Sequence, residues 1–216
     1  AAAALALAGL AAAAAPAAAA EEPETIAALG DSLTHGYGLP PEDAFPVQLQ
    51  GWLEDRGHDV TVINAGVSGD TTRGGLSRLD WTLGEGVDAV IVELGGNDLL
   101  RGIDPAESRA NLDAILAELD RRGLPALIAG LPAPGNYGPG FKREFDAMFP
   151  ELAEKWGAIH YPNFMAALSE IEDRGAAMRF MQDDGIHPNA EGVARIVEAI
   201  GPHVERLVAR ARAGEG

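Results

Sequence analysis

Two short segments, far apart in the chain, carry the side chains that a covalent acyl transfer requires. The first contains Ser32, whose hydroxyl becomes a nucleophile when a base removes its proton. The second contains His187, three residues after Asp184 and two after Gly185. A tight loop through that glycine can bring the carboxylate to Nδ1 of the imidazole while Nε2 faces the serine. These residue types at this spacing predict a nucleophile, a base and an acid that orients the base.

Two further segments offer hydrogen-bond donors for the oxyanion that forms when such a serine attacks an ester. Gly69 offers a backbone N–H, because glycine lets the main chain approach a ligand closely. Asn97 offers a side-chain amide directly after the apolar run 90–94. The N–H of Ser32 itself completes the set, and such donors often supply the largest catalytic contribution. Gly69 also fits a plain turn, but the whole set together predicts an acyl-transfer site.

Some of these assignments leave alternatives open. Asp183 is adjacent to Asp184, and spacing alone admits either as the orienting acid. His35 lies close enough to Ser32 to line a pocket, although it lacks an acid at short spacing. Glu93 interrupts an apolar strand, where it either pairs with a buried basic group or meets water at the end of the sheet.

The rest of the sequence alternates short β-like runs with helical ones, which is typical of a parallel sheet covered on both faces. The expected strands are 25–29, 60–64, 89–94, 126–131 and 158–161. The fold class is therefore α/β: one three-layer α/β/α domain with a central, mostly parallel sheet of about five strands. In such folds the site lies at the carboxyl ends of the strands, where Ser32 and Asn97 both stand.

Apolar stripes at helical spacing predict helices over 45–53 and 112–119. Asp104 and Pro105 are typical of the N-cap and first turn of the second of these. A last helix should begin near Asn189, and we expect Pro202 to bend or break it. The three tryptophans are expected to be packing residues and not residues that stack on a ligand: Trp52, Trp81 and Trp156.

The first 20 residues differ in composition from the rest. Fifteen of them are Ala and none is charged, which favours the remnant of a secretory signal over a disordered or weakly helical Ala-rich tail. Pro16 and the weak hydrophobicity of Ala disfavour a membrane anchor. We therefore expect a single domain over residues 21–216 and a periplasmic or secreted protein.

Composition excludes several other classes of function. The net charge of −17, from 33 acidic and 16 basic residues, repels nucleic acid and anionic lipid, so neither a nucleic-acid partner nor a stable membrane anchor is expected. The absence of cysteine excludes a thiol nucleophile and disulfides. No spacing of carboxylates indicates a metal site, and no phosphate-binding loop indicates a nucleotide cofactor. The expected partner is a small ester or thioester, and the expected state is a monomer or weak oligomer.

The stretches around the four segments resemble the SGNH (GDSL-type) hydrolases, a family named for a serine, glycine, asparagine and histidine. These are 29–34, 64–72, 92–98 and 181–189, and the resemblance extends over about 25–207. Within the family, the chain is similar to bacterial enzymes described as acyl-CoA thioesterases, arylesterases and lysophospholipases. The resemblance implies a cofactor-independent serine esterase that acts on carboxylic esters and thioesters through an acyl-enzyme. It favours Asp184 over Asp183 as the acid.

The loop after Asn97 is expected to select the acyl group. Its residues should line an acyl groove and act as a mobile lip: Leu99, Leu100, Arg101, Gly102, Ile103 and Asp104. Two alternatives remain, a carbohydrate O-acetyl esterase and a catalytically silent binding domain with the same fold. Only 12 aromatic residues argue against a sugar-stacking surface, and the intact set of catalytic residue types argues against a silent domain.

Overall fold

The computed structural model describes residues 23–215, so the expected signal segment at 1–20 lies outside the described residues. In the described part, five parallel strands form one sheet in the order β2-β1-β3-β4-β5. Their bounds are β1 Glu24–Gly30, β2 Val60–Gly66, β3 Ala89–Glu93, β4 Ala126–Ala129 and β5 Ile159–Tyr161. The parallel sheet and its strand positions confirm the expected fold class.

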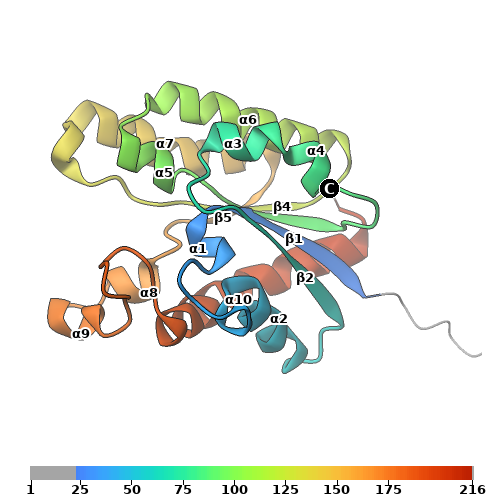
Figure 1. Cartoon of the computed structure of the whole chain (residues 1–216). Coiled ribbons are helices and arrows are strands. Elements are labelled where there is room, and N and C mark those ends of the chain that lie inside the picture. Colours follow the sequence, from blue (N-terminus) through green and yellow to red (C-terminus); the bar gives the residue numbers. More distant parts are fainter. Residues whose placement is uncertain (1–22, 216) are drawn as a thin grey trace, which may run out of the picture.

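Helices cover both faces of this sheet (Figure 1). One face carries α2 Phe45–Glu54, α8 Ala166–Ser169, α9 Arg174–Met178 and α10 Ala190–Ala213. The other carries α3 Thr72–Ser77, α4 Leu79–Thr82, α5 Gly96–Arg101, α6 Pro105–Arg121 and α7 Pro139–Trp156. The short α1, Ser32–His35, follows β1 directly, and single 3₁₀ turns occupy Pro41–Asp43 and Gly135–Tyr137. The molecule thus has the three layers that the sequence predicts.

The sheet separates two hydrophobic cores. Side chains along a strand point alternately to opposite faces, and β1 shows this directly. Ile26 and Ala28 pack into the core beneath α2 and α10, whereas Ala27 and Leu29 pack into the core beneath α6 and α7. All four are buried, as expected for a parallel sheet covered on both faces.

The helix signals in the sequence agree with the structure except at Pro202. Asp104 caps α6 by accepting a hydrogen bond from the N–H of Ala106, and Pro105 is its first residue. Asn189 caps α10 in the same way through the N–H of Gly192. However, α10 continues through Pro202, so of the two expected outcomes, a bend or a break, the break does not occur. Burial of the apolar stripe beyond the proline keeps the helix on the sheet: Val204, Leu207 and Val208.

The expected role of one tryptophan is wrong. Trp81 is 81% exposed on α4, whereas Trp52 and Trp156 pack against the two cores. Helix α7 was not expected from the sequence, although its buried Phe145, Met148, Phe149 and Leu152 have helical spacing. Within residues 23–215, no helix has both the length and the apolar character needed to cross a bilayer.

The strand order locates the crevice in which such folds bind ligands. From β1, an interior strand, the chain moves to β2 at the edge on one side and then returns to β3 on the other. This reversal opens a crevice at the carboxyl ends of β1 and β3. Ser32 follows β1 and Asn97 lies just beyond β3, so the topology brings these two side chains to one place.

Candidate active site

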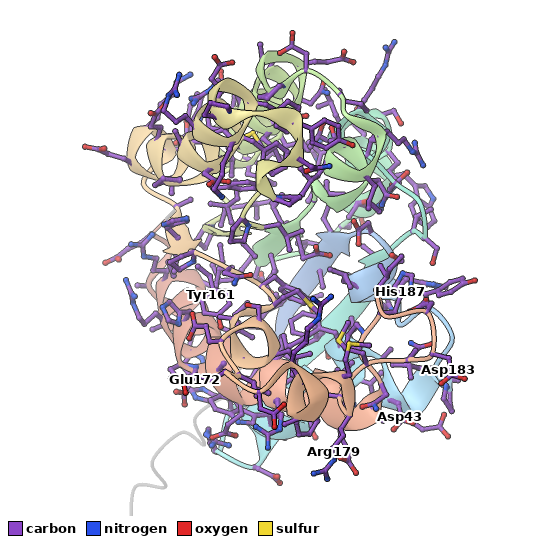
Figure 2. The ribbon with its side chains drawn as sticks, turned by 90° about the vertical axis from the view of Figure 1, so that its left-hand side faces the viewer. Asp43, Tyr161, Glu172, Arg179, Asp183 and His187 are labelled. Atoms are coloured by element: carbon purple, nitrogen blue, oxygen red, sulfur yellow. The ribbon has the colours of Figure 1, made fainter. Side chains whose placement is uncertain are left out.

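Ser32, His187 and Asp184 form a continuous chain of hydrogen bonds. The distance from His187 Nε2 to Ser32 Oγ is 2.9 Å, and the distance from His187 Nδ1 to Asp184 Oδ2 is 2.6 Å. His187 reaches the serine from a position 155 residues further along the chain. Figure 2 shows the loop on which His187 lies. This geometry allows the imidazole to take the proton of the serine hydroxyl while the carboxylate stabilises the resulting imidazolium.

A tight loop fixes the carboxylate of Asp184. Its Oδ1 accepts hydrogen bonds from the N–H groups of Ile186, at 2.9 Å, and His187, at 3.0 Å. Gly185 has φ of +65°, a left-handed conformation that favours glycine and lets the loop turn back. The hydrogen bond with the His187 imidazole and those two backbone bonds lower the pKa of Asp184 to about 2. The acid is therefore ionised at any ordinary pH.

Asp183 has a different position. Its side chain is exposed and makes no hydrogen bond within residues 23–215. Figure 2 shows it on the outer surface of the loop that carries His187. Of the two acids that the sequence allowed, only Asp184 lies within hydrogen-bond distance of the imidazole.

The loop that carries the histidine is tied to the region beyond α1. The N–H of Gln182 donates to the carbonyl of His187 at 2.8 Å, and Met181 forms an antiparallel bridge with Pro188. The side-chain amide of Gln182 donates to the carbonyls of Tyr37, at 2.7 Å, and Pro188. The ring of Tyr37 lies 4.7 Å from that of His187. Sequence reasoning missed Gln182 and Tyr37, because neither type by itself indicates a catalytic loop.

Ser32 is held by the turn between β1 and α1. Asp31 caps α1, with its Oδ1 accepting a hydrogen bond from the N–H of Leu33 at 3.0 Å. Gly30 is required for the close approach of strand and helix, because a Cβ there would lie 2.0 Å from Thr34 Oγ1. The serine is thus the first helical residue, placed at the carboxyl end of β1, an interior strand of the sheet.

Glu93 lies beneath the same turn. The sequence left open whether this acid in a strand pairs with a basic group or meets water. It is 1% exposed and forms no ion pair within the described chain, so it neither pairs with a basic group nor meets water. Its Oε2 accepts a hydrogen bond from Thr34 Oγ1 at 2.8 Å, and its Oε1 has no partner. Burial, followed by the nearby charge of Asp31, raises the pKa of Glu93 well above its usual value. Burial in this place therefore favours the protonated form of the carboxyl group.

Asn97 stands on the first turn of α5. Its Nδ2 donates one hydrogen bond to Asp31 Oδ2 at 3.0 Å. The next residue, Asp98, is buried and accepts hydrogen bonds from the N–H and hydroxyl of Thr72 and from the hydroxyl of Ser108. These bonds join α5 to α3 and α6, so the start of the helix that carries Asn97 is fixed on two neighbours.

Gly69 lies in the turn after β2 with φ of +86°. Its carbonyl accepts a hydrogen bond from the guanidinium of Arg101 at 2.8 Å, which connects this turn to the end of α5. Ser32, Gly69 and Asn97, the three expected sources of oxyanion donors, line the same cavity. The structure therefore brings together every residue that the sequence analysis assigned to catalysis.

That cavity has a volume of about 370 Å³ and mainly apolar walls. Ser32 and His187 lie in its wall together with apolar side chains from several elements: Leu33, Tyr37, Leu99, Leu100, Leu131, Met165 and Ile186. Several of these lie in loops without a periodic pattern, which is why the sequence did not indicate them. The arrangement joins a nucleophile and base to an apolar space of the size that small-molecule sites have.

The structure places part of the expected lip at this cavity, and its role in selecting the acyl group stays a prediction. Leu99 and Leu100 line the cavity, but Arg101, Gly102 and Ile103 do not. The reason is that α5 ends at Arg101, and Gly102 then adopts the left-handed conformation that turns the chain away. Arg101 instead contacts the Gly69 turn.

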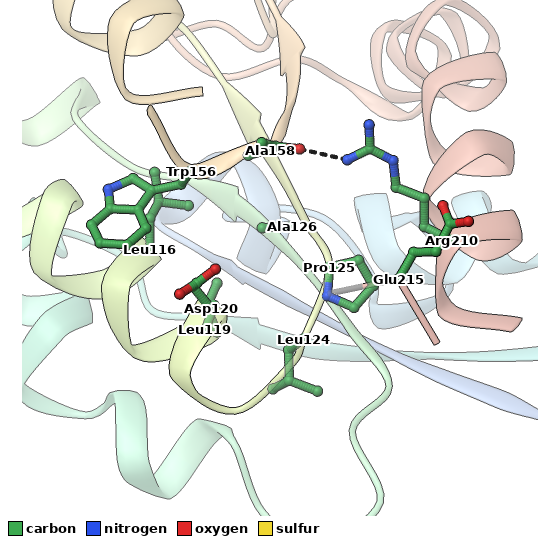
Figure 3. Close-up of a pocket in the computed structure, with 11 residues that line it drawn as sticks. Leu116, Leu119, Asp120, Leu124, Pro125, Ala126, Trp156, Ala158, Arg210 and Glu215 are labelled. Atoms are coloured by element: carbon green, nitrogen blue, oxygen red, sulfur yellow. Dashed lines mark hydrogen bonds between the residues drawn. The ribbon is translucent and has the colours of Figure 1, made fainter. Parts of the chain in front are cut away.

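A second cavity, of about 480 Å³, lies near the amino ends of β4 and β5 (Figure 3). Trp156, Arg210 and Glu215 are among its lining residues, and Arg210 donates a hydrogen bond to the carbonyl of Gly157 at 2.6 Å. Its lining contains no serine or histidine. The Ser32–His187 pair lies in the other cavity, at the carboxyl end of β1.

Comparison with known proteins identifies the class. The profile of the GDSL-like Lipase/Acylhydrolase family matches residues 28–195, and the chain belongs to this family. It is 36% identical to the Pseudomonas aeruginosa protein named Esterase TesA, over 86% of this chain and 90% of that protein. It is 35% identical to the Escherichia coli K12 protein named Thioesterase 1/protease 1/lysophospholipase L1, over 86% of this chain and 85% of that one.

A solved structure agrees with this assignment. The chain is similar to AlinE4, an SGNH-hydrolase family esterase, with 44% identity and a TM-score of 0.70. The alignment covers 87% of this chain and 98% of that one. The resemblance to SGNH hydrolases inferred from the sequence is thereby confirmed.

Proposed function

We propose that this esterase hydrolyses carboxylic esters and thioesters through an acyl-enzyme on Ser32, with aryl esters, acyl-CoA thioesters and lysophospholipids as its substrates. The observation that carries the proposal is the chain of hydrogen bonds from Asp184 through His187 to Ser32, in the wall of an apolar cavity. The names of the relatives, an esterase and a thioesterase with lysophospholipase activity, support this substrate range.

In the first half of the reaction, Ser32 Oγ attacks the acyl carbonyl while His187 Nε2 takes the hydroxyl proton. The carbonyl oxygen becomes an oxyanion, which accepts hydrogen bonds from the N–H groups of Ser32 and Gly69 and from Asn97 Nδ2. Collapse of this intermediate breaks the bond to the alcohol or thiol. His187 then donates its proton to that leaving group, and the acyl group remains on Ser32.

In the second half, His187 takes a proton from water as the water attacks the acyl-enzyme. A second oxyanion forms in the same place, and its collapse releases the carboxylic acid and returns the proton to Ser32. Throughout, the ionised Asp184 stabilises the positive charge on the imidazole. Apart from the substrate and water, these steps use only groups of the chain.

Apolar walls favour an acyl chain over a sugar in the cavity. Leu99 and Leu100 from α5 face the same space as Leu131 and Met165. This composition makes the alternative of a carbohydrate O-acetyl esterase the weaker one, because a sugar would leave its hydroxyl groups without partners there.

We also propose that the protein is exported, as a single domain over 21–216 that works in the periplasm or outside the cell. The Ala-rich, uncharged composition of residues 1–20 supports this proposal. The monomeric or weakly oligomeric state and the absence of a cofactor and of a metal remain predictions. Purification with and without chelator, followed by light scattering and metal analysis, tests these three points.

Labelling with a fluorophosphonate tests the central proposal. Wild-type protein should be labelled and should hydrolyse p-nitrophenyl butyrate and an acyl-CoA, whereas Ser32→Ala should lose the label and roughly three orders of magnitude or more of turnover. Ser68→Ala is a matched control, because Ser68 lines the same cavity and lies 2.9 Å from His35 Nδ1. Ser68→Ala should keep the label. An unlabelled, inactive wild type would instead indicate a silent binding domain.

A further inference from the structure

Two carboxyl groups lie buried beneath the nucleophile, and the catalytic steps described above use neither. Asp31 is 2% exposed and Glu93 is 1% exposed. Neither forms an ion pair in the part of the chain that the structure describes. Burying an acid without a neighbouring cation costs free energy of folding, so the presence of two such acids beneath the nucleophile needs a physical reason.

Hydrogen bonding differs between the two groups. Both oxygens of Asp31 accept hydrogen bonds, Oδ1 from the N–H of Leu33 at 3.0 Å and Oδ2 from Asn97 Nδ2 at 3.0 Å. Glu93 accepts at Oε2 only, and its Oε1 has no partner. A proton on Glu93 Oε1 therefore displaces no donor, whereas a proton on either oxygen of Asp31 would displace one. Asp31 remains the one carboxylate that faces Asn97.

A carboxylate at this position determines how the Asn97 amide is turned. The two faces of an amide differ, since Nδ2 has two N–H donors and Oδ1 only accepts. If the amide were flipped, Oδ1 would face Asp31 Oδ2, and two acceptors would oppose each other without a proton. Only the orientation with Nδ2 toward Asp31 is favourable, and the planar NH₂ group then directs its second N–H away from Asp31. Asn97 and Asp31 both line the cavity that contains Ser32.

We propose that Asp31 is a positioning residue for hydrolysis: its carboxylate holds the Asn97 amide so that the second Nδ2–H faces the developing oxyanion. The inference rests on the proposed function, in which Asn97 is an oxyanion donor. Asp31 touches no reacting atom and acts through Asn97 alone, apart from capping α1. Glu93, kept neutral, leaves Asp31 as the only negative charge that this turn must accommodate.

Two substitutions separate the positioning role from the capping role. Asp31→Asn keeps a capping oxygen for the Leu33 N–H, because Asn is as good a cap as Asp. Its amide nitrogen then faces Asn97, and that amide must flip or lose its partner. Asp31→Ser also keeps a capping oxygen but is too short to reach Asn97. Both variants should lower kcat for p-nitrophenyl butyrate by about 10²-fold, as expected for loss of one oxyanion donor, while KM stays nearly constant.

A double-mutant cycle decides the matter. Asn97→Ala alone should lower kcat by about 10²- to 10³-fold. If Asp31 acts through Asn97, adding Asp31→Asn or Asp31→Ser to Asn97→Ala should change kcat by no more than about 2- to 3-fold. Thermal melting checks that each variant folds. In folded variants, losses of kcat that multiply in the double variant, or a change confined to a rise in KM, would overturn the inference.

The same measurements distinguish this inference from the proposed function. An unchanged kcat in Asn97→Ala would remove Asn97 from the oxyanion site, and the proposed function would then need revision. If Asn97→Ala lowers kcat strongly and the Asp31 substitutions lower it further by their full factor, only the positioning role of Asp31 would be overturned. Glu93→Gln serves as the matched control, since it replaces a neutral acid by a neutral amide of similar shape and should keep kcat within about 3-fold. A loss of about 10²-fold there would place the functional charge on Glu93 and overturn the assignment.

Discussion

Replacing Asp184 by Asn should disable the base without unfolding its loop. The side-chain oxygen of Asn can still accept the two backbone N–H groups that Asp184 Oδ1 accepts, from Ile186 and His187. The amide nitrogen then faces His187 Nδ1. Because that nitrogen is itself a donor, Nδ1 must become the unprotonated acceptor and the ring proton moves to Nε2. Nε2 is the atom that has to take the proton of Ser32.

The expected loss follows from this wrong tautomer. In serine proteases, the same change at the orienting acid lowers kcat by about 10⁴-fold. At about 1.36 kcal/mol for each factor of ten, this corresponds to about 5.4 kcal/mol of transition-state stabilisation. The two backbone hydrogen bonds persist in the variant, so the loss should appear in kcat, with the fold and KM largely retained.

Asp183→Asn is the matched control, one residue away and with the same change of charge. Its side chain is exposed and contacts no catalytic group, so most activity should remain. Both variants are assayed with p-nitrophenyl butyrate at one neutral pH, and circular dichroism checks their folding. A larger loss of kcat from Asp183→Asn than from Asp184→Asn would refute the assignment of the acid. A loss below about 10-fold from Asp184→Asn would refute the tautomer argument.

Three further predictions concern the pocket, the core and pH. Replacing Leu99 and Leu100 by Ser should weaken hydrolysis of long-chain p-nitrophenyl esters far more than of the acetate, because each buried methylene contributes about 0.8 kcal/mol; equal losses along the series would contradict this. Asp98→Ala should lower the free energy of unfolding by about 3 kcal/mol, because it leaves buried donors of Thr72 without an acceptor; a loss below about 1 kcal/mol in urea titrations would be inconsistent with it. The raised pKa of Glu93 means that the folded state holds a proton which the unfolded state releases near pH 4.5, so its contribution to stability decreases as pH rises above that value. Glu93→Gln removes this pH dependence, so the unfolding free energy of the variant minus that of wild type should increase between pH 5 and 7. A difference that stays constant over this range would show that Glu93 is ionised in the folded protein.

Much of the fold could be predicted from the sequence because local patterns and packing agree. The apolar runs of β1, β3 and β4 are buried on both faces, so burial enforces what the pattern indicates. Local rules failed where distant contacts outweigh them. Pro202 removes one backbone hydrogen bond, but the buried stripe beyond it keeps α10 continuous. Trp81 is apolar by type, yet its place on α4 leaves it without a core to enter.

The candidate site was predictable to a similar degree. Residues with distinctive chemistry at short spacing could be singled out in advance, His187 above all, but spacing alone did not choose between Asp183 and Asp184, and only the family resemblance favoured Asp184. The acyl cavity could not be delimited, because its walls come from loops whose course depends on backbone conformations such as the left-handed turn at Gly102. The partner of Asn97 was equally hidden, since Asp31 precedes it by 66 residues and only the sheet brings the two together.

The separation of 155 positions between Ser32 and His187 has a consequence for how activity is acquired during folding. The nucleophile and its oxyanion donors belong to the first half of the chain, but the base arrives only with the segment that leads into α10. That helix packs against α2 and β1 and so completes one of the two cores. Such long-range contacts form slowly, because the chain loses the entropy of closing a long loop before the contacts stabilise it. Recovered esterase activity therefore reports completion of the fold, and a chain that stops before α10 should have no catalytic base in place.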